Sequence, residues 1–136
     1  MSILGPLEWH RFANGDFLEP IRVCRLAPEF VNLLGAKEDR ILIHPGVAPK
    51  LVFKHKLTAF QMPMIPIAAD LGAVVQDRNG ALSFFYDDQN VFGKIFHLAV
   101  KTTSERHEIW ISTFHKIRND EYVRRLKKGR LVRPQK

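Results

Sequence analysis

The stretch RHEIWISTFHKIRNDEYVRRLKKGRLVR, residues 106–133, decides how this chain is interpreted. Residues 106–114 alternate apolar and polar side chains, which predicts a β-strand. A polar corner follows at residues 112–115, and residues 119–128 then combine a capping residue with a basic helical pattern that a glycine ends. We therefore predict a last strand that brings polar side chains to a surface next to a cationic helix and tail.

Net positive charge is confined to the C-terminal end of the chain. Residues 1–113 contain 12 Lys or Arg and 12 Asp or Glu, whereas residues 114–136 contain 9 basic and 2 acidic residues. The second segment therefore carries the whole net charge of +7. A neutral domain with a cationic end predicts an anionic partner, and a polyanion such as nucleic acid fits so concentrated a charge.

The composition is that of one globular domain. With 136 residues and 46% hydrophobic side chains, the chain is long enough to bury a core. Its single cysteine, Cys24, excludes an intramolecular disulfide, and the nearby Ile21 and Val23 predict a small buried thiol. No apolar run approaches the roughly 18 residues of a membrane span, and no signal-peptide pattern is present. We expect a cytoplasmic protein without membrane insertion.

Strand and helix patterns also precede the opening stretch, while turn signals make residues 1–16 look irregular. Strands are predicted at residues 19–26, 40–44, 72–76, 81–86 and 94–102, and helices at residues 28–34, from about 47, and from 63 to about 71. The predicted fold class is α+β, with helices packed on one face of a four-stranded antiparallel β-meander and an N-terminal strand–helix extension. We predict a single domain over residues 1–136, in which residues 1–45 form the extension and residues 46–136 the core.

Alternation sorts the side chains of the last two strands into two faces. The residues predicted to face the helices are Phe96, Leu98 and Val100, which leaves His97 on the open face. In the last strand, one face is predicted to hold Ile109, Ile111 and Thr113, and the other Trp110, Ser112 and Phe114. The open face is the predicted binding surface. Aromatic rings suited to base stacking are present at Tyr86, Phe114 and Tyr122, and each suits a core position equally well.

Two histidines lie among cations in a way that suits acid/base chemistry. His55 is flanked by Lys54 and Lys56, and His115 is followed by Lys116. Neighbouring positive charge lowers the pKa of an imidazole and keeps it neutral, so that it can act as a base. Such a pair suits metal-free cleavage of an RNA phosphodiester, in which a base takes the 2′-hydroxyl proton and an acid protonates the leaving 5′ oxygen. Each histidine on its own also fits a solvated surface residue.

We assign the predicted catalytic roles to four residues. His55 and His115 are the acid and the base, and Ser112 and Thr113 are hydroxyls that orient the phosphate. The residues predicted to bind phosphate or RNA are all cationic: Lys54, Lys56, Lys116, Arg118, Arg124, Arg125, Lys127, Lys128 and Arg130. No carboxylates cluster in the sequence in a way that suits Mg²⁺, so neither a metal nor a cofactor is predicted.

Four motifs between Lys50 and Arg133 are similar to those of a known family. They are Lys54-His55 ahead of the sheet, Ile65-Pro66 before the first meander strand, the hairpin VKTTSERHEIW, and the strand end ISTFH, which a basic segment follows. Together they resemble the phage-associated branch of the barnase–EndoU–colicin–RelE superfamily of metal-independent ribonucleases. The resemblance implies helices on one face of a four-stranded antiparallel sheet, with RNA cleaved to 2′,3′-cyclic phosphates on the other. It also implies that His55 is the helix histidine and that Ser112 or Thr113 is the strand hydroxyl.

The function predicted from these observations is that of a toxin-type endoribonuclease acting on tRNA or other structured RNA. Its further partner would be an antitoxin or immunity protein, and its place of action the cytoplasm, including that of a target cell. Two alternatives remain open. One is an RNA- or DNA-binding module without catalysis, favoured because no acidic partner for the histidines is evident. The other is a phage or host protein-interaction domain whose basic tail meets an acidic protein. The oligomeric state is left open.

Overall fold

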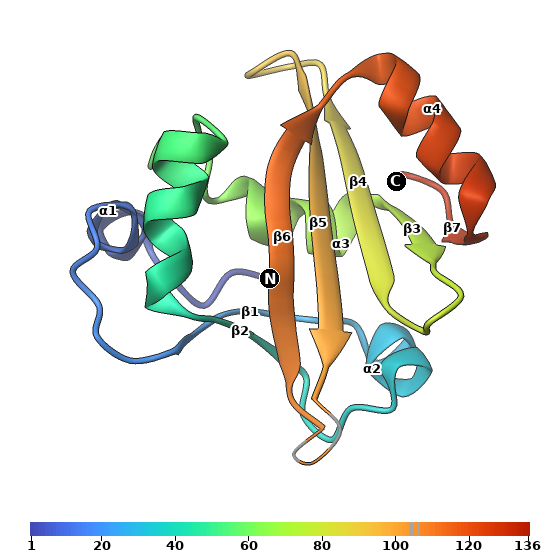
Figure 1. Ribbon diagram of the computed structural model, residues 1–136, viewed down its shortest axis with the longest axis horizontal. Helices are drawn as coiled ribbons and strands as arrows, with labels where there is room; N and C mark the ends of the chain where they lie inside the picture. Colours follow the sequence, from blue (N-terminus) through green and yellow to red (C-terminus); the bar gives the residue numbers. More distant parts are fainter. Residues whose placement is uncertain (104, 106) are drawn as a thin grey trace.

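The computed structural model describes residues 1–103, 105 and 107–136, and their strands form one seven-stranded mixed sheet (Figure 1). The strands are β1 (Ile21–Arg25), β2 (Arg40–Ile43), β3 (Ala73–Gln76), β4 (Leu82–Asp88), β5 (Lys94–Thr102), β6 (Ile109–Ile117) and β7 (Arg130–Arg133). Their order across the sheet is β1-β2-β6-β5-β4-β3-β7. Strands β3 to β6 pair with their sequence neighbours in antiparallel fashion.

The predicted fold class, a four-stranded antiparallel meander with an N-terminal extension, is wrong. Strand β2 joins the sheet by pairing parallel to β6, through Ile41 opposite Ile109 and Leu42 opposite Trp110. The C-terminal tail, predicted only to be cationic, forms β7 and pairs antiparallel to β3. Local alternation identifies a strand but says nothing about its partner, because pairing between distant segments is decided by packing of the whole chain.

Helices occupy both faces of the sheet and one of its flanks. They are α1 (Pro6–Ala13), α2 (Pro28–Leu34), the 3-10 helix η1 (Pro45–Val47), the π-helix η2 (Lys50–Lys54), α3 (Met64–Leu71) and α4 (Asn119–Lys128). The prediction of an irregular N-terminus is wrong because Trp9 and Phe12, one helical turn apart, bury the same side of α1. In Figure 1, α3 lies behind β5 and β6, while the chain around η2 lies beside β6.

The main core lies between the sheet and the segments around α1, α2 and α3. The predicted inward residues of β5, Phe96, Leu98 and Val100, are fully buried there. A second, smaller cluster lies on the opposite face, where Tyr122 and Leu126 of α4 pack near Phe85. The expectation that helices cover only one face is therefore wrong. The reason is that Tyr122 and Leu126, four residues apart, give the basic helix an apolar stripe that the sheet buries.

A β-bulge at Ser112 turns the side chains at the end of β6 to the opposite sheet face from the one that alternation predicts. The register runs from Ala99 opposite Thr113 directly to Val100 opposite Ile111, so Ser112 is an extra residue. Thr113 therefore leaves the face predicted from alternation. Phe114 turns into the main core and is 0% exposed, so of the two roles open to this ring, core packing is the one that the structure shows. The bulge places His115 on the same face as its cross-strand neighbour His97.

The boundaries of the last strand differ from the predicted ones. The turn expected at residues 103–105 includes Ser104, and the expected strand start is Arg106; both lie outside the described residues. The last strand continues to Ile117, so the polar segment 112–115 belongs to the strand rather than to a corner. In the part of the chain that the structure describes, no helix is long and apolar enough to cross a membrane.

Candidate active site: a histidine cluster on the second face of the sheet

Three histidines from different elements form a continuous cluster. The ring of His55 stacks on that of His115, with centroids 5.2 Å apart and planes 25° apart. The ring of His97 meets His115 edge to face, again with centroids 5.2 Å apart. His97 and His115 are register partners on β5 and β6, and His55 follows η2. The cluster therefore joins the flanking π-helix to the centre of the sheet.

The chain around η2 is held in place by an unusual turn. His55 ends the π-helix, and its backbone N–H donates to the carbonyl of Lys50. Lys56 then adopts a left-handed conformation with φ of 57°, which is uncommon outside glycine. The Lys56 carbonyl accepts a hydrogen bond from Nζ of Lys116 at 3.1 Å, which ties this turn to β6. That bond brings the His55 ring onto His115, the neighbour of Lys116.

His97 forms the floor of the cluster. It is only 2% exposed, and its Nε2 is hydrogen-bonded to Oγ of Ser83 at 3.0 Å. Its ring stacks on Phe85, with centroids 4.5 Å apart and planes 10° apart. Its Nδ1 is buried without a hydrogen-bond partner. So enclosed a ring cannot reach a substrate, and its contribution is to support His115 from below.

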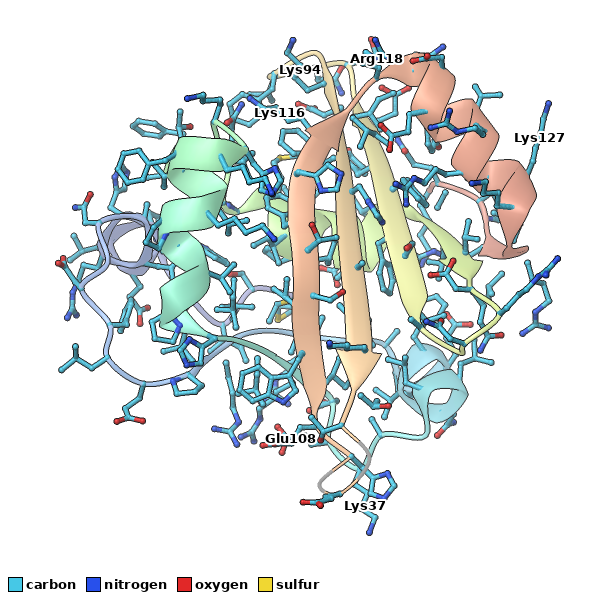
Figure 2. The ribbon with its side chains drawn as sticks, viewed as in Figure 1. Lys37, Lys94, Glu108, Lys116, Arg118 and Lys127 are labelled. Carbon is cyan, nitrogen blue, oxygen red and sulfur yellow. The ribbon has the colours of Figure 1, made fainter. Side chains whose placement is uncertain are left out.

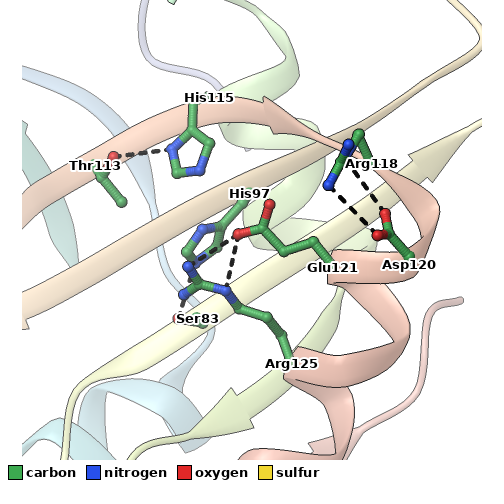
Figure 3. Close-up of polar contacts among 8 residues, drawn as sticks. All are labelled: Ser83, His97, Thr113, His115, Arg118, Asp120, Glu121 and Arg125. Atoms are coloured by element: carbon green, nitrogen blue, oxygen red, sulfur yellow. Dashed lines mark hydrogen bonds and ion pairs between the residues drawn. The ribbon is translucent and has the colours of Figure 1, made fainter.

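Helix α4 provides the other side of the cluster (Figure 3). Tyr122 packs on Phe85, with ring centroids 5.6 Å apart. One turn of helix further, Arg125 donates from Nε and Nη2 to Oε1 of Glu121 at 3.2 and 3.0 Å. Figure 3 shows this ion pair next to His97. A carboxylate therefore does lie near the histidines, contrary to the sequence-based view that no acidic partner exists.

Thr113 lies beside His115 in the cluster. Its Oγ1 is hydrogen-bonded to Nδ1 of His115 at 3.0 Å, between residues on the same side of β6 (Figure 3). This bond occupies Nδ1 and leaves Nε2 of His115 for chemistry. In His55 it is Nε2 that is buried without a partner, so Nδ1 is the ring nitrogen left for chemistry.

The surroundings lower the pKa of all three imidazoles. For His55 the pKa is lowered by burial first and then by the positive charges of Lys50 and Lys54. Burial also lowers the pKa of His115, together with His55, Arg125 and Lys50, while Glu121 opposes the shift. The pKa of His97 falls to about 3, through burial and then the charges of His115 and Arg125. At neutral pH the cluster is therefore an uncharged set of imidazoles with cations around it.

The structure gathers only part of the predicted site. Beyond the pair of histidines, Thr113 is present, and Lys54 acts on His55 through its charge. Ser112 is exposed at the bulge, and its Oγ donates to the carbonyl of Ala99 at 3.1 Å. Lys116 is engaged with the η2 turn, and Arg125 with Glu121.

The basic residues of α4 and β7 spread away from the histidines. Arg124, Lys127 and Lys128 are exposed, and Figure 2 shows Lys127 pointing outward from α4. Arg130 is hydrogen-bonded through Nη2 to Oε1 of Gln76 at 2.7 Å, on the far side of β3. These residues do not contribute to the cluster itself and form a separate cationic surface.

Four residues of the site were not assigned to it from the sequence: Lys50, Ser83, His97 and Glu121. Ser83 and His97 occur in strands of ordinary alternation, where either is read as a sheet residue. Only the pairing of the strands shows that they belong to the site. Ser83 lies opposite Ala99, and its side chain reaches His97 across the pair of strands β4 and β5. Glu121 could have been found from its spacing to Arg125, which is that of a helical ion pair.

Among the described residues, no group of three or more His, Cys, Asp or Glu side chains is arranged to hold a metal ion. The buried Cys24 is remote from nucleophilic chemistry, since burial raises the pKa of its thiol to about 12. No protein-family model, curated protein or solved structure matches the chain.

Proposed function

We propose that the protein is an endoribonuclease that cleaves RNA without a metal, by transesterification to a 2′,3′-cyclic phosphate, with His55 and His115 as its acid/base pair. The observation that carries this proposal is the stacked contact between those two rings, both with lowered pKa and surrounded by lysines. Paired imidazoles with a pKa below neutrality supply both a base and an acid over a narrow pH range. Cations beside them offset the charge that develops on the phosphate.

The available ring nitrogens indicate how the pair works. Nδ1 of His55 and Nε2 of His115 are the nitrogens left for substrate, and the substrate phosphate lies across these edges because the stacked rings leave no room between them. The neutral imidazole removes the proton from the 2′-hydroxyl, and the 2′ oxygen forms a bond to phosphorus. The bond from phosphorus to the 5′ oxygen breaks, and the protonated imidazole delivers its proton to that leaving oxygen.

The remaining residues have supporting roles in this proposal. Thr113 fixes the orientation of the His115 ring through their hydrogen bond, and the buried His97 holds the ring from the other side. Lys50 and Lys54 place positive charge near His55. We assign Thr113 and His97 to positioning, because the Thr113 hydroxyl is hydrogen-bonded to His115 and His97 is almost completely buried.

The proposal is tested with a fluorogenic RNA oligonucleotide and total RNA in the presence of EDTA. We expect products with 2′,3′-cyclic phosphate ends, no cleavage of a 2′-deoxy substrate, and a loss of about 100-fold or more in His55→Ala and in His115→Ala. His44→Ala is the matched control, because His44 is an exposed histidine whose ring only caps the turn at Gly46. Intact RNA with the wild-type protein, or full activity in both variants, contradicts the proposal.

The same proposal includes a biological role for the enzyme. A toxin-type enzyme acting in the cytoplasm on tRNA or other structured RNA, and held in check by an antitoxin or immunity protein, is consistent with such chemistry. Sequencing of the cyclic-phosphate ends formed in total RNA identifies the target. Cleavage spread evenly over all RNA classes would contradict the preference for tRNA.

A second candidate function is binding of nucleic acid without cleavage. The specific observation in its favour is the separate cationic surface of α4, in which Arg124, Lys127 and Lys128 are exposed and point away from the histidines. Such a surface binds phosphates regardless of what the histidines do, with strong dependence on salt. Salt-sensitive binding of RNA that stays intact would favour this alternative over the ribonuclease.

A further inference from the structure

An open pocket lies at one end of the histidine-bearing face. It has a volume of about 450 Å³, and its lining includes Gln89, Lys94, Ile95, Ile117, Arg118 and Asn119. Figure 2 shows Lys94 and Arg118 together at the upper end of β5 and β6, with Lys37 at the opposite end. Among the lining residues two are positively charged and none is negatively charged.

The pocket continues the line of the histidines along the sheet. His97 lies opposite His115, and the next pair on the same face is Ile95 opposite Ile117, which lines the pocket. Lys94 and Arg118 lie one residue beyond this pair, so their backbone is about 10 Å along the strands from His97 and His115. The long side chains of Lys94 and Arg118 can cover part of that distance toward a phosphate that neighbours the one at the histidines. A strand with one phosphate at the histidines therefore presents its next phosphate to this pocket.

Both cations of the pocket are available to an incoming anion. Lys94 is exposed, and none of the ion pairs found in the described part of the chain involves it. Arg118 pairs with Asp120 at 3.4 Å, but the two side chains are 85% and 70% exposed. So exposed a pair contributes little free energy, and a phosphate can displace it at small cost. A guanidinium binds phosphate through two parallel hydrogen bonds, and the Asn119 amide adds a neutral donor.

We propose that this pocket is a subsite for the phosphate next to the scissile one, held by Lys94 and Arg118. The inference rests on the proposed ribonuclease function, and it defines the substrate as an oligoribonucleotide with at least two phosphates. A bare dinucleotide, which has only the scissile phosphate, would fill the histidine cluster and leave the pocket empty. Arg118, predicted from the sequence to bind the scissile phosphate, binds its neighbour in this arrangement.

The test compares three substrates: a dinucleotide, the same dinucleotide with a 5′-phosphate, and the same with a 3′-phosphate. We expect one of the two added phosphates to raise kcat/KM by about tenfold or more, as a charge-assisted contact does. In Lys94→Ala and Arg118→Ala that gain should fall several-fold. In Lys37→Ala, the control at the far end of the sheet, it should persist. A gain that is absent from the wild type, or unchanged in both pocket variants, overturns the subsite.

A binding measurement separates this inference from the proposed function. The probe is a labelled 2′-deoxytrinucleotide, which cannot be cleaved by attack of a 2′-hydroxyl, and the readout is fluorescence anisotropy. We expect Lys94→Ala to raise Kd several-fold and Lys37→Ala to leave it unchanged. If the wild-type protein cleaves no RNA, the ribonuclease proposal fails while a weaker Kd in Lys94→Ala still supports the pocket. If RNA is cleaved but Kd is equal in both variants, the subsite fails and the ribonuclease stands.

Discussion

The ring of His55 lies 5.2 Å from the ring of His115 and nearly parallel to it, although 60 positions separate them in the sequence. One ring ends a π-helix that flanks the sheet, and the other stands on β6 just beyond a β-bulge. The contact depends on both irregularities. Their conjunction at one point is what makes this part of the surface a candidate active site.

Stability should fall on acidification because of His97. Its folded-state pKa of about 3 lies below the ordinary value of 6.5, so between these values the unfolded chain binds a proton that the folded chain does not. Unfolding free energy therefore rises with pH in that window and falls as pH drops from 6.5 toward 3, by up to about 1.4 kcal/mol per pH unit for this group. Urea titrations at pH 7 and pH 5 measure the effect. His97→Gln should flatten the slope and His10→Gln should not; equal slopes in all three proteins would refute this role.

Ribonuclease activity should peak on the acidic side of neutrality. One imidazole must be neutral and the other protonated, and the pKa of each is lowered from 6.5, so both limbs of the pH profile shift to lower pH. Glu121→Gln removes the charge that raises the pKa of His115 and should move the profile further toward acid. The control is Glu29→Gln in α2, on the other face. A profile of kcat/KM that Glu121→Gln leaves in place argues against the assigned role of this carboxylate.

Deleting Ser112 should keep the fold and the facing of the end of β6. Because Ser112 is the extra residue, its deletion joins Ile111 to Thr113 in regular alternation, which keeps Phe114 in the main core and His115 on the second face. Ser112→Ala keeps the bulge and loses only one exposed hydrogen bond to Ala99, for a cost of about 1 kcal/mol or less. Circular dichroism with urea denaturation measures both variants, and both should unfold cooperatively. Loss of cooperative unfolding in the deletion variant would contradict the description of Ser112 as an extra residue in β6.

Gly129 should tolerate no side chain. A Cβ there would lie 2.6 Å from the carbonyl oxygen of Gln76 and 2.6 Å from Cγ1 of Val75, where the chain passes from α4 to β7. Gly129→Ala must push β7 or α4 away from β3, and we expect a loss of about 1–3 kcal/mol in unfolding free energy. Gly5→Ala is the control, because its nearest contact would be 3.7 Å away. Equal stability of both variants would contradict this close approach.

Phe114 should behave as a core residue and not as a binding residue. It is completely buried and stacks on Phe96 with ring centroids 5.8 Å apart. Phe114→Ala should lower the unfolding free energy by about 3–5 kcal/mol. Phe53→Ala is the matched control, since that ring is 73% exposed on η2 and its removal leaves no cavity. A small loss in Phe114→Ala would mean that the ring is not packed as described.

Much of the local structure could be predicted from the sequence. The predicted helix at 28–34 with its glycine stop, the strand at 94–102 and the basic helix at 119–128 are confirmed, because each depends on neighbours in the sequence. The site could be predicted in part. His55 and His115 stood out among lysines, whereas His97 looked like one more strand residue.

The sequence by itself determined the order of most helices and strands, the inward residues of β5 and the concentration of charge after residue 113. Only the tertiary structure decided the parallel pairing of β2 with β6, the addition of β7 and the packing of α4 on the second face. It also decided the meeting of His55, His97 and His115, which depends on the extra residue in β6 and the tie between Lys116 and Lys56. The physical reason is that periodicity reports one strand or helix at a time. Pairing partners, bulges and contacts between elements are set by the packing of the whole chain.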